Sequence, residues 1–276
     1  MDIKHPYENK KDQISPDNHE YSVSSLDKSR CNLRADCENC FGLCCVALYF
    51  SASEGFPINK EPGQPCINLQ SDFRCCVYKS LWEKGLKGCI AFDCFGAGQK
   101  VAQISFNKID WDKSPESAKQ MFEVFLIMRQ LHEMLWYMTE ALTFQAAYPI
   151  HEAIRSMLDD TERLTYLSPD SLLKMDIAGH REKVNVLLIK TSELVRAEIR
   201  HDQISKLGYK RTLGQGADLI GADLRTADLR GANLRNAYLI AADLRGNDLS
   251  YTDFIGADFR DADLKGADLT KSIFLT

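Results

Sequence analysis

The sequence contains no run of about 18 apolar residues, and no apolar segment follows its first methionine. These absences exclude a membrane span and a secretory signal, so we expect a cytoplasmic protein. It also lacks an excess of basic residues, because 34 lysines and arginines stand against 39 aspartates and glutamates. General nucleic-acid binders and proteins that bind anionic membranes need a basic surface. Direct nucleic-acid binding is therefore not expected.

No histidine lies between Cys31 and Cys94, the segment that holds all ten cysteines. In a reducing compartment, a dense cysteine cluster predicts metal ligands before disulfides. The alternative is an oxidised, disulfide-linked domain, which lacks the secretion signal that it would need. Without histidine, a site here would be all-thiolate apart from help from Asp36 or Asp93. Soft sulfur ligands select zinc or an iron–sulfur cluster over hard cations.

Changes in composition divide the chain into four parts, which predict a multidomain α+β protein. Residues 1–30 are polar and predict a disordered leader, because they offer too little apolar surface to offset ordering. Residues 31–112 carry the cysteines with glycine and proline punctuation, which favours loops. Residues 113–206 predict a small helical bundle, and residues 207–276 contain a repeat.

Helix signals begin at Ser114-Pro115-Glu116, which combines an N-cap residue, a proline suited to the first helical position and an acidic side chain. A second signal of this kind stands at Ser168-Pro169-Asp170. Apolar residues at helical spacing follow the first signal: Phe122, Phe125, Leu126, Met128, Leu131, Leu135, Met138 and Leu142. A second set comprises Val184, Leu187, Leu188, Leu194, Val195 and Ile199. We expect three or four helices.

From Ala217 onward the period is five residues, as in Ala217-Asp218-Leu219-Ile220-Gly221. Neither a helix nor a strand has this period, so the repeat predicts a solenoid. The residues resemble the pentapeptide-repeat family, and the resemblance covers residues 217–276. It implies a right-handed, four-sided β-helix of about three coils, with alanine and leucine or phenylalanine inside.

If four units form one coil, residues twenty apart stack on one outer face. One face is expected to be neutral, with Asp223, Asp243 and Asp263 beside Arg225, Arg245 and Lys265. A second is expected to stay acidic, with Asp228, Asp248 and Asp268 beside Arg230, Ser250 and Thr270. Two further faces are expected to expose apolar groups, Ile220, Tyr238 and Ile240 on one and Ile255, Ile273 and Leu275 on the other. Contiguous exposed apolar groups predict protein contacts.

Some members of this family protect DNA gyrase from quinolones by mimicking duplex DNA. Mimicry needs a long negative rod, since DNA presents one charge per about 1.7 Å. Three coils span only about 14 Å, and arginines interrupt the acidic faces. Protection of a topoisomerase is therefore a secondary alternative to a docking role. A homodimer through the last coil is a further expectation, because an uncovered solenoid end invites a partner.

The cysteine spacing includes Cys37-x2-Cys40 and, after three intervening residues, the pair Cys44-Cys45. A CxxC turn can aim two thiolates at one ion. The pattern is similar to a family of cysteine-cluster domains described as zinc- or iron-chelating. That resemblance implies eight metal ligands: Cys37, Cys40, Cys44, Cys45, Cys66, Cys75, Cys89 and Cys94. Cys31 and Cys76 lie outside it, and the insertion 79–88 departs from the family.

The sequence predicts a metal-binding scaffold or sensor that contacts protein partners through the repeat. The alternative is an iron–sulfur redox enzyme that uses the cysteine cluster. No catalytic residue is predicted, because His132, His151, His180 and His201 all fit surface or bundle positions better than a general base. Phe95-Gly96-Ala97-Gly98-Gln99 predicts a tight turn, since it lacks the third glycine of a dinucleotide loop. The apolar face from Phe122 to Met138 is interpreted as bundle core.

Overall fold

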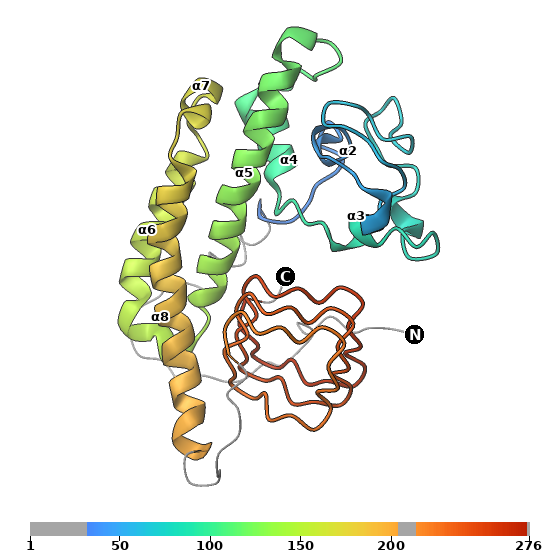
Figure 1. Ribbon diagram of the computed structural model, residues 1–276. Coiled ribbons are helices and arrows are strands. Elements are labelled where there is room, and N and C mark those ends of the chain that lie inside the picture. The colour runs from blue at the N-terminus through green and yellow to red at the C-terminus, as the bar shows by residue number, and fades with distance from the viewer. Residues whose placement is uncertain (1–31, 204–213, 275–276) are drawn as a thin grey trace, which may run out of the picture. The chain divides into compact units, whose positions relative to one another are not determined.

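A computed structural model of the chain describes residues 32–203 and 214–274, which divide into two compact units (Figure 1). Residues 32–143 and 148–188 belong to the first unit. Residues 144–147, 189–203 and 214–274 belong to the second. The described residues do not include the predicted leader, Cys31, the side chain of His201 or Leu275.

The cysteine-rich segment consists mainly of loops, as its composition predicts. Its regular elements are short: α2 (Leu43–Ala47), η1 (Ala52–Glu54), η2 (Tyr78–Ser80) and α3 (Lys87–Ala91). Two isolated antiparallel bridges, Phe50 with Lys60 and Leu69 with Cys75, hold neighbouring loops together. Phe73 also contacts both Phe41 and Trp111, with ring centroids 5.6 and 5.4 Å apart. A few aromatic contacts therefore replace an extended backbone ladder.

The glycine-containing turn before the bundle opens α4 (Ala97–Lys100), which runs into the π-helix η3 (Val101–Ser105). Gly96 has a φ of 76°, a left-handed conformation that glycine adopts without a steric cost. Gly98 serves a different purpose, because a Cβ there would lie 2.5 Å from the sulfur of Cys40. The local sequence thus forms a turn and allows close approach to the cysteine segment.

The first long helix, α5 (Pro115–Ala141), begins at the proline that the sequence predicts. Five residues of the predicted apolar stripe are buried in it: Phe125, Met128, Leu131, Leu135 and Met138. Leu126 departs from the prediction, since 42% of it is exposed. It lies at the edge of the stripe, where the mixed three- and four-residue spacing no longer keeps every apolar side chain on the packed face.

The rest of the helical region comprises η4 (Gln145–Ile150), α6 (His151–Leu164), α7 (Pro169–Leu173) and α8 (Ile177–Gln203). In the first unit, α5 packs against α6 and α7. The signal at Ser168 opens only the five-residue α7, with the Ser168 hydroxyl accepting a bond from the Ser171 amide. The long helix starts later, after Asp176, whose carboxylate accepts a bond of 2.9 Å from the Gly179 amide. Several helices are confirmed, but the second start signal belongs to a short one.

The repeat forms a coil in which each bridge joins residues twenty apart. Seven parallel bridges have this spacing: Asp218–Tyr238, Asp223–Asp243, Asn233–Asp253, Tyr238–Asp258, Asp243–Asp263, Asp248–Asp268 and Asp253–Ile273. The Tyr238 amide, for example, donates to the Ala217 carbonyl at 2.9 Å. Four five-residue units therefore make one coil.

Apolar side chains fill the axis of this coil, as the family pattern implies. The fully or nearly buried residues are Leu219, Leu224, Leu229, Leu234, Leu239, Leu244, Leu249 and Phe254. Asn247 and Thr252 stand where the repeat usually has alanine, and both are buried. Asn247 donates to the carbonyls of Leu224 and Ala227, and Thr252 donates to that of Leu229 at 2.6 Å. These departures tie one coil to the preceding one.

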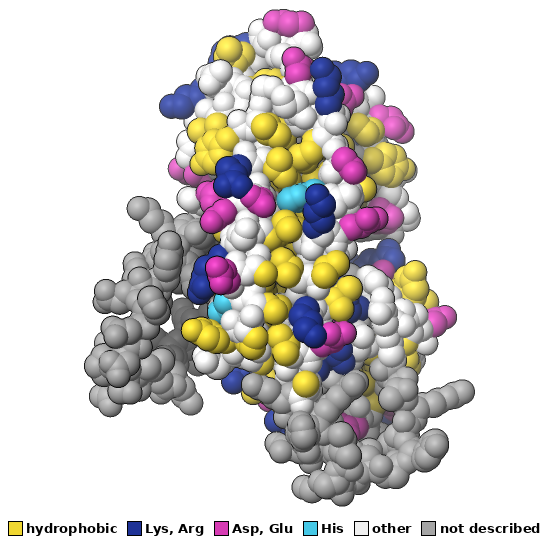
Figure 2. Space-filling model, turned by 90° about the vertical axis from the view of Figure 1, so that its left-hand side faces the viewer, with side chains coloured by type: hydrophobic (Ala, Val, Ile, Leu, Met, Phe, Trp, Pro, Cys, Tyr) yellow, Lys and Arg dark blue, Asp and Glu magenta, His cyan; other side chains and the backbone are white. Residues whose placement is uncertain are grey.

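Within the described ranges, no helix combines the length and apolar character needed to cross a membrane. The face shown in Figure 2 intersperses acidic, basic and apolar side chains and gathers no broad patch of one charge.

Candidate functional site

The eight predicted metal ligands are contributed by loops and two short helices of the first unit. Cys37 and Cys40 precede α2, which holds Cys44 and Cys45. Cys89 lies in α3, and the remaining three occupy loops or a bridge position: Cys66, Cys75 and Cys94. All nine cysteines that the structure describes are free thiols. Cys76, which falls outside the predicted set, is exposed.

Cys44 is at the electrostatic centre of these thiols. Its sulfur lies 3.9 Å from that of Cys45. A charge on Cys44 raises the pKa of six other cysteines: Cys37, Cys40, Cys45, Cys66, Cys89 and Cys94. Cys75 in turn acts on Cys44. The eight residues are thus linked to Cys44 by charge interactions.

The insertion 79–88 does not remove Cys89 and Cys94 from these interactions. The amide of Gly88 donates to the carbonyl of Gly55 at 3.0 Å, so the end of the insertion is fastened to the loop after η1. Charge on Cys94 acts on Cys37 and Cys40, whereas Cys89 responds to Cys66 and Cys75. One subset contains Cys37, Cys40 and Cys94, and the other contains Cys66, Cys75 and Cys89. Both subsets are coupled to Cys44 by charge.

The environment of the cluster favours neutral thiols over thiolates at most positions. Burial raises the pKa of Cys37 and of Cys89 to about 11 and that of Cys40 to about 12. Cys75 and Cys44 depart from this pattern, because hydrogen bonds with Cys45 lower the pKa of Cys75 to about 6 and hold that of Cys44 below its ordinary value. The hydrogen bonds of Cys45 with Cys44 and Cys75 in turn raise the pKa of Cys45. A cation bound here would have to displace protons from most of its ligands.

The donor atoms suit a soft cation, but their present arrangement is not a closed coordination shell. Among residues 32–203 and 214–274, no three histidine, cysteine or acidic side chains are grouped closely enough to hold a metal ion. Zinc in proteins is held by four ligands at about 2.0 to 2.3 Å. Binding would therefore require these loops to close around the ion. The ligand assignments remain predictions.

Lys60 is a component of the cluster that sequence reasoning missed. It is 4% exposed, and its ammonium donates to the carbonyls of Val46, Leu48 and Glu61 at 3.3, 2.5 and 3.3 Å. Burial lowers the pKa of Lys60, while charge on Cys66, Cys45 and Cys44 opposes that shift. A buried ammonium thus offsets part of any thiolate charge. A single lysine between loops gives no sequence signal of this role.

The outer faces of the coil match the predicted charge pattern in part. On the predicted neutral face, Arg225 bridges Asp223 and Asp243 at 2.7 and 3.4 Å, and Arg245 bridges Asp243 and Asp263 at 2.6 and 3.6 Å. On the acidic face, only Arg230 approaches Asp248, at 3.9 Å, among the described side chains. The neutral face is therefore confirmed as an alternating ladder of charges.

The apolar faces require one correction. Ile220 and Tyr238 are 57% and 53% exposed, as predicted. Ile273 was expected on the surface but is fully buried. It stacks in register on Asp253, which is also fully buried and pairs with the 7%-exposed Arg235 at 2.9 Å. This column of the coil is shielded from solvent, a property that repeat spacing alone does not reveal.

Comparisons with known proteins give a family match and a similar protein. Residues 215–246 and 237–274 match the family of pentapeptide repeats, with eight copies. The chain is 57% identical over 199 residues to the Bacillus subtilis (strain 168) protein titled "Uncharacterized protein YybG". The aligned residues make up 72% of this chain and 70% of that protein. No solved structure matches the chain. The chain therefore belongs to the family of Bacillus subtilis YybG and carries pentapeptide repeats at its C-terminal side.

Proposed function

We propose that the protein is a cytoplasmic metal-binding scaffold or sensor whose cysteine segment holds zinc or iron and whose repeat contacts protein partners. The observation that carries the metal proposal is the pair of sulfurs of Cys44 and Cys45, 3.9 Å apart, together with the charge coupling of the other predicted ligands to Cys44. The proposed ligands are Cys37, Cys40, Cys44, Cys45, Cys66, Cys75, Cys89 and Cys94.

Electrostatics supports a role for a cation at this cluster. Each thiolate raises the cost of forming the next one, as the effects of Cys44 and Cys94 on Cys37 illustrate. A soft cation would reverse that effect, because it binds the deprotonated sulfur. Bound zinc would supply folding energy to a segment with few regular elements, whereas an iron–sulfur cluster would supply electron transfer.

The repeat is suited to protein contacts by two features. The Asp–Arg ladder leaves one face close to neutral, and Ile220 and Tyr238 expose apolar surface on another. The half-buried Leu264 and Leu269 near the last coil support the proposal of a homodimer through that end. Light scattering at high micromolar concentration should then give twice the mass of the chain, whereas a monomer would count against the dimer.

The two alternative functions predict different results. An iron–sulfur redox enzyme would be brown and absorb near 400 nm after anaerobic purification, which distinguishes it from a zinc protein. A topoisomerase-protection protein would relieve quinolone inhibition of gyrase in a supercoiling assay. The paired Asp223, Asp243 and Asp263 do not favour this second alternative, since arginines neutralise them.

Elemental analysis of protein purified without oxygen or chelator tests the metal proposal. We expect zinc, or iron with acid-labile sulfide, in whole-number ratio to the chain. The Cys44→Ser variant should lose this metal, because Cys44 is central to both subsets. The Cys76→Ser variant is the matched control, since Cys76 is exposed and outside the predicted set. A metal-free wild-type chain that also fails to bind added zinc or iron would overturn the proposal.

A further inference from the structure

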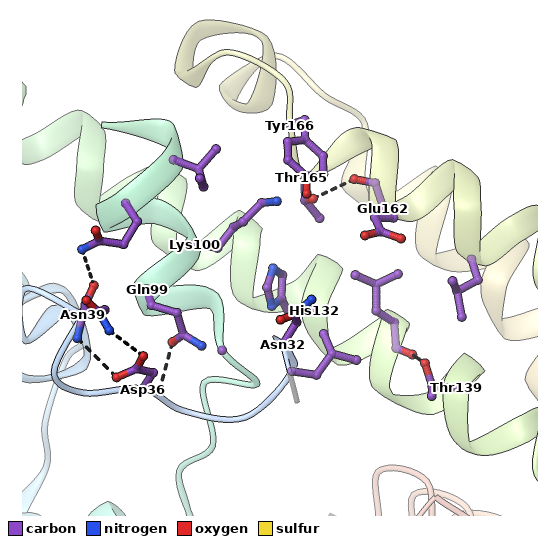
Figure 3. A pocket seen from close by; sticks show the side chains of 16 residues that line it. Asn32, Asp36, Asn39, Gln99, Lys100, His132, Thr139, Glu162, Thr165 and Tyr166 are labelled. Carbon is purple, nitrogen blue, oxygen red and sulfur yellow. Dashed lines mark hydrogen bonds between the residues drawn. The ribbon is translucent and has the colours of Figure 1, made fainter. Parts of the chain in front are cut away.

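A cavity of about 410 Å³ lies within the first compact unit, beside the helices rather than among the cysteines. Its walls come from the chain before α2, from α4 and η3, from α5 and from the end of α6 (Figure 3). This volume falls within the range of about 300 to 1,000 Å³ found for small-molecule sites. Four aliphatic residues contribute to the lining: Leu33, Ile104, Leu135 and Leu158.

Hydrogen bonds between segments more than 60 residues apart in sequence hold the wall of the cavity in place. Gln99 accepts a bond of 3.2 Å from the Asp36 amide and donates one of 2.7 Å to the Arg34 carbonyl. Gln103 donates to the Asn39 carbonyl at 2.8 Å. These side-chain amides are engaged in the wall, so the cavity is preformed.

His132 presents a hydrogen-bond acceptor to this cavity. The residue is 5% exposed, and its Nδ1 lies 2.7 Å from the Phe95 carbonyl oxygen. A carbonyl can only accept, so Nδ1 carries the proton and Nε2 keeps its lone pair. Burial, aided by the charge of Lys100, lowers the pKa of His132 to about 4 and keeps the ring neutral. No described residue supplies a hydrogen bond to Nε2.

Two opposite charges line the same cavity without neutralising each other. The Lys100 ammonium lies 3.1 Å from the centroid of the Tyr166 ring, which holds it at the wall by a cation–π contact. Glu162 lies on α6 and is exposed. Neither side chain forms an ion pair within the part of the chain that the structure describes. Figure 3 shows both beside His132.

We propose that this cavity binds a free α-amino acid with an aliphatic side chain. The Lys100 ammonium would receive its carboxylate, while Glu162 and His132 Nε2 would accept hydrogen bonds from its ammonium group. Leu33, Ile104, Leu135 and Leu158 would cover the aliphatic side chain. A zwitterion suits the site because it satisfies both unpaired charges, whereas a simple anion or cation satisfies one.

Sequence reasoning missed this site because its parts come from four separate segments. His132 and its apolar neighbours have the spacing of a bundle core, and most of α5 is indeed core. Neither Lys100 nor Glu162 belongs to a recognisable motif. The proposal also does not depend on metal binding.

Calorimetric titration of the full chain with leucine tests the proposal. Two compounds serve as matched probes, 4-methylpentanoate, which lacks the ammonium group, and 3-methylbutylamine, which lacks the carboxylate. We expect leucine to bind and each analogue to bind at least about tenfold more weakly. Lys100→Met and Glu162→Gln should each weaken leucine binding by a similar factor.

Lys119→Met and Glu152→Gln are the controls, since both residues lie on exposed helix positions outside the cavity lining. These two variants should bind leucine as the wild type does. The proposal is overturned if the folded wild type binds none of leucine, isoleucine, valine and methionine at millimolar concentration. It is also overturned if either analogue binds as well as leucine, or if the cavity variants bind leucine normally.

Discussion

The cysteine-rich segment and the pentapeptide repeat achieve order in opposite ways. In the repeat, each coil provides a template for the next, through bridges twenty residues apart and a continuous row of buried leucines. The cysteine segment has two isolated bridges and no described helix longer than five residues before Cys94. Order in the repeat is therefore local and repeated, whereas the cysteine segment depends on a few long-range contacts and, in our proposal, on a metal ion.

The largest expected difference between the two regions follows from removing metal ligands. Replacing Cys37 and Cys40 together with serine should abolish metal binding and unfold the cysteine segment, because a structural metal site contributes on the order of 10 kcal/mol. The repeat should remain folded. Limited proteolysis with mass spectrometry would locate the cleavage, and Cys76→Ser is the control. Cleavage within residues 214–274 of the double variant would contradict the independence of the repeat.

Truncating a core side chain of the repeat should have the opposite effect, because it should destabilise the repeat and leave the metal of the cysteine segment in place. Leu229 is fully buried, so Leu229→Ala should cost about 2 to 5 kcal/mol of unfolding free energy while metal content stays unchanged. Ile220→Ala removes an aliphatic side chain that is 57% exposed and should cost less than about 0.5 kcal/mol. Urea unfolding, read against metal content, measures both. Loss of metal in Leu229→Ala would show that the regions are coupled.

Turn glycines offer a smaller and more local test of the repeat. Gly256 and Gly221 have φ values of 68° and 63°, so alanine at either position should cost about 1 to 2 kcal/mol in backbone strain. At Gly256 the new Cβ would also collide with the side-chain oxygen of Asn236, whereas Gly221 faces open space. We expect Gly256→Ala to lower the melting temperature more than Gly221→Ala. Equal effects would mean that Asn236 moves aside without cost.

The smallest expected effect concerns the charge ladder on the coil. Two hydrogen bonds from Arg225 hold the pKa of Asp223 at about 2, below its ordinary value of 3.8. Because the folded-state pKa is depressed, the contribution is complete above about pH 4 and is lost as the pH falls towards 2. Asp223→Asn should slightly lower the melting temperature at neutral pH and low salt, with Asp228→Asn as control. Wild type and variant should converge near pH 2, and a constant gap would argue against the ladder.

The sequence predicted best those features that depend on residues close together in the chain or in the next coil. The resemblance to pentapeptide repeats implies the twenty-residue stacking and the inward leucines, and both are confirmed because each unit makes the same backbone turn. Ser114-Pro115 likewise locates the start of α5, since proline suits the first helical position. The neutral face carrying Asp223 and Arg225 was predictable because its charges lie close together in the chain or in the next coil.

Features that depend on tertiary contacts were not predictable from the sequence. The burial of Ile273 depends on how its column of the coil is shielded, and the burial of Lys60 depends on loops that have no regular register. The cavity around His132 is assembled from segments as far apart in sequence as Asn32 and Tyr166. The spacing of the cysteines indicates a cluster, but it does not fix which thiols share an ion.

Hydrogen exchange followed by mass spectrometry, with and without removal of metal by a chelator under anaerobic conditions, most directly tests the central claim. The proposal predicts that chelation abolishes protection in the described residues of the cysteine segment, about 32–96, and leaves residues 214–274 unchanged. Returning zinc or iron should restore the protection. Identical exchange before and after verified metal removal would contradict the account, because the cysteine segment would then be ordered by its protein contacts alone.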